Sequence, residues 1–183
     1  MLGLRKGERV VNPVKPEWGV GLVLNNEFKG RVYVYFIWAG KKLLFTTYVK
    51  LEIARGWKRI SPVLDLIERE LLDEGDLIEG HHNIYVIELD KNVLQNRKFR
   101  EANPQHISSK PCVYVGMTGL TPEERFTSHR SGYKSSYYPH KYGQKLLYEF
   151  FQSLNPMPYK LACLMESELA NHLRCKGFGV WQN

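Results

Sequence analysis

Two stretches decide the fold of the second half of the chain: residues 83–89 read NIYVIEL, and residues 111–117 read PCVYVGM. Both are short runs of β-branched, aliphatic and aromatic residues, which are typical of strands. Downstream, Thr121 and Pro122 are suited to the cap and the first position of a helix. The alternation of strand and helix patterns predicts an α/β unit over residues 81–183.

The rest of this unit is expected to be mainly helical. Residues 91–110 are a polar, basic insertion between the two strands, residues 144–153 and 161–174 are predicted helices, and residues 177–181 are a predicted terminal strand. We therefore expect a small central antiparallel sheet flanked by helices.

The first part of the chain has the shorter period of a β-structure. Strand-like runs over residues 9–11, 19–24, 31–38 and 42–47 are separated by turn residues such as asparagine, proline and glycine. Four or five short strands in so few residues predict a small β-barrel over residues 1–56. The chain as a whole is therefore expected to belong to the α+β class.

Charge divides the chain into three parts. Residues 1–60 have 12 basic and 4 acidic residues, residues 61–80 have 1 and 7, and residues 81–183 have 13 and 8. The acidic segment also has a helical pattern over residues 61–74, with Ser61 as its cap and Gly75 as its stop. We interpret residues 57–80 as an acidic linker helix between two basic units.

Composition excludes several classes of protein. The 183 residues have a net charge of +7 and 43% hydrophobic residues, a globular mixture that does not fit a disordered chain. No apolar run is long enough to cross a membrane, and the N-terminus lacks a signal-peptide pattern. The three cysteines have no CxxC spacing, so no zinc site is predicted. We expect a soluble, cytoplasmic protein, and its positive charge weakly suggests a nucleic-acid partner.

Three short motifs carry a resemblance in the first unit: GERVV at residues 7–11, WGVG at 18–21 and YVKLE at 48–52. The stretch resembles the Tudor-like, SH3-like barrel at the C-termini of bacterial DNA helicases. The resemblance implies a docking module without chemistry of its own, which would bind DNA or a protein such as a helicase, RNA polymerase or repair complex. The alternative is that its aromatic residues only fill a small core.

The second unit resembles the GIY-YIG nuclease superfamily. The matching elements are NIY at residues 83–85, VYVG at 113–116, a helix arginine with a histidine four residues later, an acidic residue on a later helix, and a terminal asparagine. The resemblance implies a metal-dependent endonuclease acting on DNA. It also implies the site residues, which are Tyr85, Tyr114, Arg125, His129, Glu166 and Asn183.

These residue types suit phosphodiester hydrolysis. The guanidinium of Arg125 can bind two phosphoryl oxygens, and the carboxylate of Glu166 is a ligand for Mg²⁺ or Mn²⁺. Tyr85 would take a proton from the attacking water once nearby cations lower its pKa, with Tyr114 and His129 positioning the water or relaying the proton. The division of roles among these three stays open. Glu168 competes with Glu166 for the metal, but it points further from the buried stripe of its helix.

The sequence departs from the family pattern at three points. Asn83 replaces a glycine, Met117 stands where many relatives have a lysine, and 28 residues separate Tyr85 from Tyr114. The first two departures leave open a non-catalytic adaptor that binds nucleic acid through a nuclease-like fold. A further alternative places the main function in the barrel.

Residues 128–145 are the predicted substrate surface. They contain no acidic residue, and their cations alternate with tyrosines that can stack on sugars or bases. The alternative is a solvated polar loop. The residues predicted to bind DNA, besides Asn183, are Arg130, Lys134, Tyr137 and Lys141.

Overall fold

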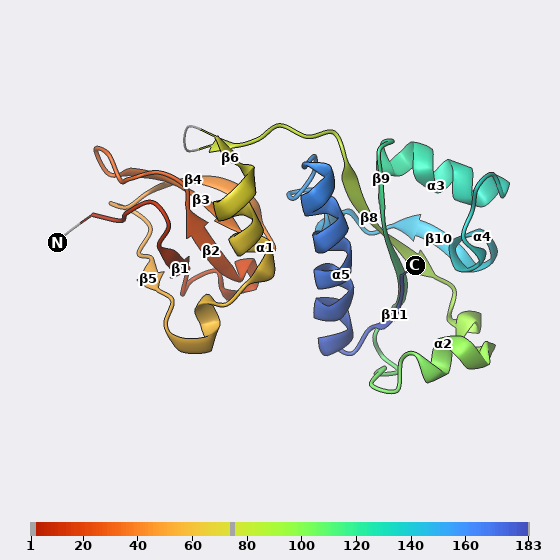
Figure 1. Cartoon of the computed structure of the whole chain (residues 1–183). Coiled ribbons are helices and arrows are strands. Elements are labelled where there is room, and N and C mark those ends of the chain that lie inside the picture. The colour runs from red at the N-terminus through yellow and green to blue at the C-terminus, as the bar shows by residue number, and fades with distance from the viewer. Residues whose placement is uncertain (1–2, 74–75, 183) are drawn as a thin grey trace. The chain divides into compact units, whose positions relative to one another are not determined.

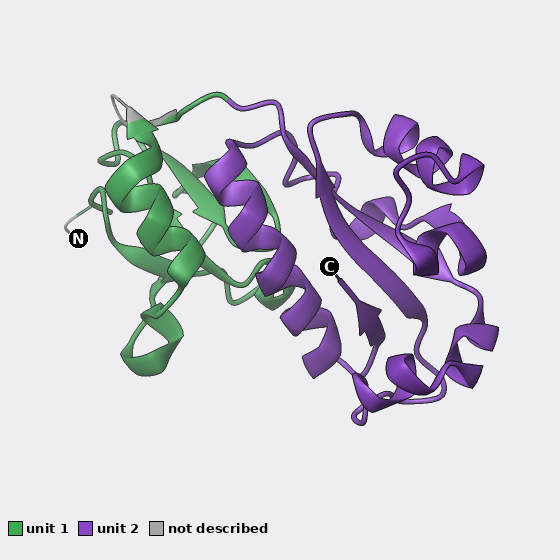
Figure 2. Cartoon of the chain, turned by 45° about the vertical axis from the view of Figure 1, so that its right-hand side comes forward, with its two compact units in different colours: residues 1–79 green, residues 80–183 purple. Residues whose placement is uncertain are grey.

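The computed structural model describes residues 3–73 and 76–182, and the chain divides into two compact units, Met1–Glu79 and Gly80–Asn183 (Figures 1 and 2). Each unit has its own sheet with helices, so the predicted α+β class is confirmed. In the described part of the chain, none of the helices is long and apolar enough to cross a membrane.

The first unit is built on a five-stranded sheet in the order β4-β3-β2-β1-β5, in which all neighbours are antiparallel. Short 3-10 turns, Pro16–Trp18 and Gly56–Arg59, precede β2 and follow β5. The predicted run over residues 9–11 matches its strand, the runs over 19–24 and 31–38 are longer than theirs, and the run over 42–47 begins and ends two residues after its strand does. The strands are β1 Arg9–Val11, β2 Val20–Val23, β3 Arg31–Phe36, β4 Gly40–Phe45 and β5 Glu52–Ile53.

One face of this sheet forms the core of the first unit. Val32, Val34 and Phe36 alternate along β3 and are fully buried, as the period of a strand requires. Trp18 packs on Phe36 with ring centroids 5.1 Å apart. Tyr33, on the other face, is exposed, so the aromatic residues of this unit only partly fill its core.

The acidic segment, predicted as a linker, lies within the first unit up to Glu79. Ser61 caps it as predicted, because its hydroxyl accepts a hydrogen bond from the Leu64 N–H at 3.3 Å. The helix is shorter than predicted, since acidic side chains at the negative end of its dipole oppose its extension. It comprises α1 Pro62–Leu66 and a π-helical turn Ile67–Leu71, after which β6 Leu72–Asp73 pairs with β7 Asp76–Leu77. The predicted stop, Gly75, lies outside the described residues.

A buried arginine fixes the acidic segment to the sheet. Arg9 of β1 is 7% exposed, and its Nη2 lies 2.9 Å from the Asp65 carboxylate and 2.8 Å from the Glu68 carboxylate. On the helix, Val63, Leu64 and Ile67 are fully buried. The acidic residues of this segment therefore compensate a buried cation of the same unit.

The second unit is built on a four-stranded sheet in the order β10-β8-β9-β11. Its strands are β8 Asn83–Leu89, β9 Cys112–Thr118, β10 Gly143–Leu146 and β11 Gly179–Trp181. The predicted antiparallel pairing holds for β10, β8 and β9, whereas β11 runs parallel to β9. A long helix connects the earlier elements to β11, and such a crossover permits parallel pairing.

Helices cover both faces of this sheet. Figures 1 and 2 show the long helix α5 on one side and α3 and α4 on the other. The prediction of a helix over residues 144–153 is wrong. This stretch forms β10 and a 3-10 turn, because β10 pairs with the edge of β8. The helices and 3-10 turns are Lys91–Gln95, α2 Arg97–Glu101, α3 Pro122–Ser131, α4 Tyr137–Tyr142, Tyr148–Phe150 and α5 Tyr159–Cys175.

The basic insertion between β8 and β9 is folded into this unit. Val93 and Phe99 are fully buried, although most of their neighbours in the sequence are polar. The buried Asn103 accepts a hydrogen bond from the Val180 N–H at 2.7 Å and donates one to the Phe99 carbonyl at 2.9 Å. The insertion thereby stabilises the edge strand β11.

Candidate active site of the second unit

Sheet register places the two predicted tyrosines side by side. Tyr85 lies opposite Gly116, and Tyr114 lies opposite Ile87, so both side chains leave the same face of adjacent strands. Their ring centroids are 6.1 Å apart, and both residues are almost completely buried. The face that they share is the one covered by α3 and α4.

A glycine makes room for the Tyr85 hydroxyl. A Cβ atom at Gly116 would lie 2.6 Å from the Tyr85 hydroxyl oxygen and 2.9 Å from the Tyr114 ring. Any other residue at this position would displace one of the two tyrosines. Gly116 is therefore part of the site, although it was predicted only as part of a strand motif.

His129 connects α3 to the two tyrosines. It is fully buried, and its Nε2 lies 2.8 Å from the Tyr85 hydroxyl. Its ring centroid is 5.8 Å from that of Tyr85 and 5.6 Å from that of Tyr114. The helix begins as predicted at Pro122, with Thr121 and Glu124 in a capping box, and this fixes the turn that carries His129.

The other ring nitrogen of His129 determines the direction of this hydrogen bond. Nδ1 lies 3.0 Å from the Ser135 hydroxyl, whose single proton has carbonyl acceptors at 3.0 Å on Ser136 and 3.1 Å on His129. With the proton on Nδ1, Ser135 accepts from Nδ1–H while it donates to a carbonyl, and Nε2 accepts from the Tyr85 hydroxyl. With the proton on Nε2, Nδ1 accepts from the Ser136 N–H at 3.4 Å and Nε2–H donates to the Tyr85 oxygen. The first arrangement links Tyr85 to Ser135 through His129.

The second tyrosine has a separate partner. The Tyr114 hydroxyl lies 3.1 Å from the hydroxyl of Ser136, the residue that precedes α4. Ser135 and Ser136 thus orient His129 and Tyr114, and sequence reasoning did not single them out. Their signal was a pair of small hydroxyl residues just before a helix, a common position for capping side chains.

The expectation that nearby cations lower the pKa of Tyr85 is wrong for the protein without bound metal or DNA. Burial raises the pKa of Tyr85 above its ordinary value, the neighbouring Tyr114 adds to the rise, and Arg125 offsets only part of it. Burial also raises the pKa of Tyr114, with Ser136 and Arg125 among the groups that oppose the rise. Burial destabilises the phenolate forms of Tyr85 and Tyr114 by more than the Arg125 guanidinium stabilises them.

His129 has the opposite shift. Burial, together with the positive charges of Arg125 and His140, lowers the pKa of His129 to about 4. Its imidazole is therefore neutral at physiological pH and can accept a proton. The Tyr85–His129 pair is consequently a neutral donor and acceptor.

Arg125 lies one helical turn before His129 on the same side of α3. Its Nη2 donates a hydrogen bond to the Lys134 carbonyl at 3.2 Å, and its charge acts on both tyrosines and on His129. The side chain is partly exposed. It can therefore meet a ligand from solvent while it contacts the buried groups.

Glu166 lies on α5, which covers the opposite face of the sheet, and it is linked to the site by the effect of its charge on Tyr114. Its charge raises the pKa of Tyr114, and burial raises the pKa of Glu166 itself to about 7. Among the described residues, β11 pairs with β9 only as far as Tyr114. The charge of Glu166 is among the main influences on the pKa of Tyr114, which favours Glu166 over Glu168 as the acidic member.

Glu166 would need water molecules as the other ligands of a bound cation. Residues 3–73 and 76–182 contain no group of three or more His, Cys, Asp or Glu side chains that could hold a metal ion. Mg²⁺ commonly retains several waters and uses one or two protein carboxylates. Glu166 fits that kind of ligand set as the single carboxylate.

Two departures from the family pattern have different surroundings. The Asn83 amide donates hydrogen bonds to the carbonyls of His81 and Leu120 at 3.2 and 3.0 Å, so it ties the start of β8 to the loop after β9. Asn155, which sequence reasoning did not select, also fixes β8 through both the N–H and the carbonyl of Ile84. Met117 of β9 has an uncharged side chain, so this position supplies no cation.

The predicted substrate surface is only partly a surface. Arg130, Lys134, Tyr137 and Lys141 are exposed, but Tyr138 in the same stretch is buried and Lys145 pairs with Glu88 at 3.2 Å. Lys141 donates a hydrogen bond to the Tyr137 hydroxyl at 3.0 Å. Asn183 lies outside the described residues.

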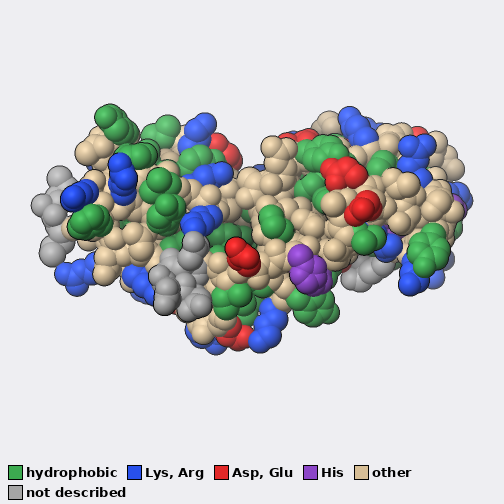
Figure 3. Space-filling model, turned by 90° about the horizontal axis from the view of Figure 1, so that it is seen from above, with side chains coloured by type: hydrophobic (Ala, Val, Ile, Leu, Met, Phe, Trp, Pro, Cys, Tyr) green, Lys and Arg blue, Asp and Glu red, His purple; other side chains and the backbone are tan. Residues whose placement is uncertain are grey.

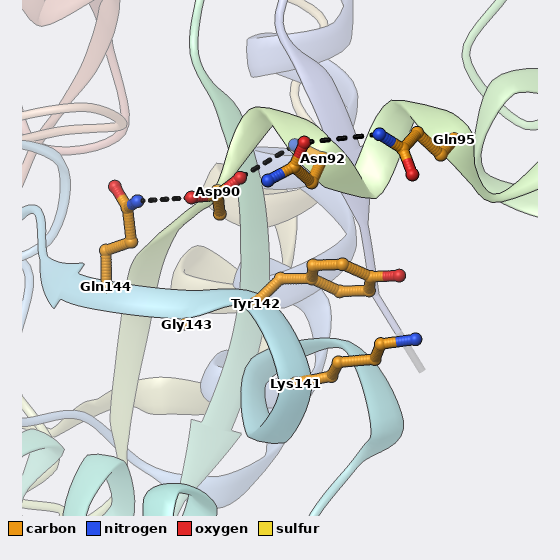
Figure 4. A pocket seen from close by; sticks show the side chains of 7 residues that line it. All are labelled: Asp90, Asn92, Gln95, Lys141, Tyr142, Gly143 and Gln144. Carbon is orange, nitrogen blue, oxygen red and sulfur yellow. Dashed lines mark hydrogen bonds between the residues drawn. The ribbon is translucent and has the colours of Figure 1, made fainter.

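A pocket of about 590 Å³ lies beside this surface, between the turn that follows β8 and the end of α4 (Figure 4). One wall is a row of hydrogen-bonded polar groups, in which Gln144 donates to Asp90 at 3.0 Å and Gln95 donates to Asn92 at 3.3 Å. Figure 4 shows the Tyr142 ring and the Lys141 side chain extending alongside this row.

The first unit has a second candidate surface, on the outer face of β3 and β4. Register places Arg31 opposite Phe45 and Tyr33 opposite Leu43. The Arg31 guanidinium lies 5.4 Å from the Phe45 ring centroid, and the Lys41 ammonium lies 4.7 Å from that of Tyr33. Figure 3 shows hydrophobic side chains and Lys or Arg mixed over this unit. This surface could bind phosphates and stack on bases or aromatic side chains.

Comparison with known proteins concerns the first unit alone. A family described as "Protein of unknown function (DUF3553)" matches residues 4–54. No curated protein and no solved structure matches the chain. The match includes the first sheet and none of the predicted catalytic residues, so the function of the second unit must be argued from its geometry.

Proposed function

We propose that the protein is a metal-dependent DNA endonuclease, with a GIY-YIG-type nuclease fold in the second unit and an SH3-like, Tudor-like docking barrel in the first. The observation that carries the proposal is the cluster of Tyr85, Tyr114, Arg125 and His129 from two strands and one helix, with the charge of Glu166 on a second helix acting on Tyr114. The two strands and the helices come from separate parts of the sequence, and the fold alone does not require these side chains to meet. Such residues rarely gather around buried hydroxyls by chance.

The neutral Tyr85–His129 pair supports a proton relay. The attacking water transfers a proton to the Tyr85 oxygen as the Tyr85 hydroxyl proton moves to His129 Nε2. The resulting hydroxide attacks phosphorus, the bond to the leaving oxygen breaks with its electron pair remaining on that oxygen, and the leaving oxygen takes a proton from solvent. This route avoids a free phenolate, which the raised pKa of Tyr85 opposes. The negative charge of a bound phosphate would also favour the imidazolium that forms.

Arg125 and Glu166 supply the charge stabilisation. The planar guanidinium of Arg125 can bind two phosphoryl oxygens as negative charge develops. A divalent cation such as Mg²⁺ or Mn²⁺, held by Glu166 and water, would stabilise the leaving oxygen. Because burial raises the pKa of Glu166 to about 7, the site should bind a cation better as pH rises through neutrality.

The first unit would recruit the enzyme to its substrate or to a protein complex. Residues 28–51 contain no acidic residue, and the outer face of β3 and β4 places Arg31 and Lys41 over aromatic rings. This favours a polyanion such as DNA or an acidic protein surface.

The test is cleavage of supercoiled, branched and single-stranded DNA with Mg²⁺ or with EDTA. We expect Mg²⁺-dependent products from the wild type and a loss of at least ~100-fold for Arg125→Ala. The matched control is Arg69→Ala, which removes an exposed helix arginine from the first unit. Cleavage by the wild type that does not exceed that of Arg125→Ala on any substrate would refute the nuclease proposal.

A non-catalytic DNA-binding adaptor is the second candidate. The raised pKa values of Tyr85 and Glu166, and Met117 in place of a cation, favour it. An adaptor would bind these DNA substrates without cleaving any of them, with or without Mg²⁺. The same experiment therefore separates the two functions.

A further inference from the structure

Two pockets of the second unit lie between residues 90–98 and α4. The pocket of Figure 4 lies between residues 90–95 and the end of α4. A second pocket, of about 580 Å³, lies between residues 96–98 and the start of α4, and Trp181 of β11 closes it. We call the second pocket the aromatic pocket. Its lining residues are Asn96, Arg97, Lys98, Tyr137, Tyr138 and Trp181.

The aromatic pocket presents rings to solvent. The ring centroids of Tyr138 and Trp181 are 4.3 Å apart, and those of Tyr137 and Tyr138 are 5.3 Å apart and nearly perpendicular. Phe99 supports Trp181 from below in a stacked arrangement at 6.4 Å. Tyr137 is 53% exposed, and Trp181 is partly exposed. The pocket is therefore rigid at its base and accessible at its rim.

The pocket lies next to the candidate catalytic groups. Trp181 lies opposite Tyr114 in the parallel pair of β11 and β9, so the two side chains leave the same face of the sheet. From the other wall, Ser136, whose hydroxyl contacts that of Tyr114, directly precedes Tyr137. A group bound in the aromatic pocket would lie beside Tyr114.

The charges at the rim suit a phosphate. Lys98 lines the pocket, and Lys141 lies 5.4 Å from the Tyr137 ring centroid. Arg97 is held by Glu101 at 2.7 Å, so the two lysines supply most of the positive charge. The acidic Asp90 is in the neighbouring pocket of Figure 4, where Gln144 and the Asn92 N–H bind its carboxylate.

We propose that the aromatic pocket binds an unpaired base of the DNA substrate, which directs the nuclease to branched, bulged or single-stranded sites. This inference rests on the proposed function and names its substrate class. A base inside a duplex has both faces covered by its neighbours, so only an unpaired base can stack on these rings. The Asn96 oxygen accepts from the Tyr138 hydroxyl and from the Phe99 N–H, and its side chain also hydrogen-bonds Tyr137, so Asn96 orients both tyrosines of the pocket.

The test measures binding in EDTA, so that it does not depend on cleavage. The probes are a labelled duplex, the same duplex with one extrahelical adenine, and the same duplex with an abasic nucleotide in place of that adenine. We expect the wild type to bind the adenine bulge about ten-fold more tightly than the other two. Trp181→Ala and Tyr137→Ala should remove this preference, so that each variant binds all three probes with similar affinity.

Two further variants separate recognition from folding. Trp181→Phe retains a ring and should retain most of the preference, and Tyr159→Ala removes an exposed tyrosine of α5 and should retain all of it. Circular dichroism and thermal unfolding check each variant, and the exposed Tyr137 provides a test if Trp181→Ala fails to fold.

Several outcomes would overturn the inference. These are equal affinity of the wild type for all three probes, equal weakening of all three by Tyr137→Ala, or competition by an acidic peptide but not by a single-stranded oligonucleotide. The nuclease proposal fails on a different result, a lack of Mg²⁺-dependent cleavage, and that result would not change the preference measured in EDTA.

Discussion

Tyr35 of the first unit and Tyr85 of the second are both buried tyrosines on β-strands, and burial raises the pKa of each. Among the described residues, the Tyr35 hydroxyl has no hydrogen-bond partner, whereas the Tyr85 hydroxyl contacts His129 at 2.8 Å. Tyr35 is a structural residue of a sheet, and Tyr85 belongs to a network with a proton acceptor and a cation. What surrounds the hydroxyl, rather than burial, distinguishes a candidate catalytic tyrosine.

Removing each hydroxyl in turn tests this comparison and should give the largest effect. We expect Tyr85→Phe to reduce DNA cleavage by ~100- to 1000-fold, because the proton relay is broken. Tyr35→Phe should leave cleavage unchanged and keep or raise the free energy of unfolding by up to ~1 kcal/mol, since it removes an unpaired polar group. Cleavage rates and urea unfolding measure both. Equal cleavage by the two variants would contradict the assignment of Tyr85.

Substitutions of two glycines test how much space the Tyr85 hydroxyl needs. Gly116→Ala places a methyl group 2.6 Å from the Tyr85 hydroxyl, so we expect a ~100-fold loss of cleavage and ~1–3 kcal/mol of destabilisation. Gly119→Ala is the matched control, because the nearest atom to its Cβ would be 3.7 Å away, on His82. Both variants are measured by cleavage and thermal unfolding. Full activity of Gly116→Ala would show that the hydroxyl position is not critical.

The buried charge of the first unit provides a contrast with the site of the second. Arg9→Met leaves Asp65 and Glu68 without their shared cation, and it also removes the unpaired Nη1. Because the two carboxylates are nearly half exposed, we expect a loss of only ~1–2 kcal/mol in the stability of the first unit. Cleavage of naked DNA should stay within about two-fold of wild type. A large loss of cleavage would indicate that the first unit contributes to catalysis.

Glu166 should show the smallest effect on stability, with a characteristic pH dependence. Its pKa is raised from 4.5 to about 7, so the folded state binds more protons than the unfolded state between these values, and stability falls as pH rises through this window. Glu166→Gln lacks this penalty. After allowance for its partial exposure, we expect the variant to be ~1 kcal/mol more stable than wild type at pH 8 and equal to it at pH 4.

The same variant should lose Mg²⁺-dependent cleavage. Glu168→Gln is the control for both measurements, since it removes a neighbouring carboxylate of α5. If Glu166→Gln has the stability of the wild type at both pH values, burial does not destabilise the Glu166 carboxylate.

Elements with strong local sequence signals were predicted correctly, and the wrong predictions have identifiable physical causes. The strand over residues 83–89 and the helix that begins at Pro122 are found as predicted, because β-branched runs and capping residues act over short distances. The predicted helix over residues 144–153 instead forms β10, since pairing with β8 outweighs its helix-forming residues. Tyr138 was predicted on the surface but packs against Trp181, a contact that no local pattern encodes.

The sequence by itself determined the α+β class, the positions of most strands and helices, and the five residue types that suit phosphodiester chemistry. Only the tertiary structure decided which groups meet. It placed His129 on Tyr85, Ser136 on Tyr114 and the acidic segment on Arg9. The physical reason is range: capping and strand propensity depend on neighbours in the chain, whereas hydrogen-bond partners, burial and pKa depend on residues brought together by folding.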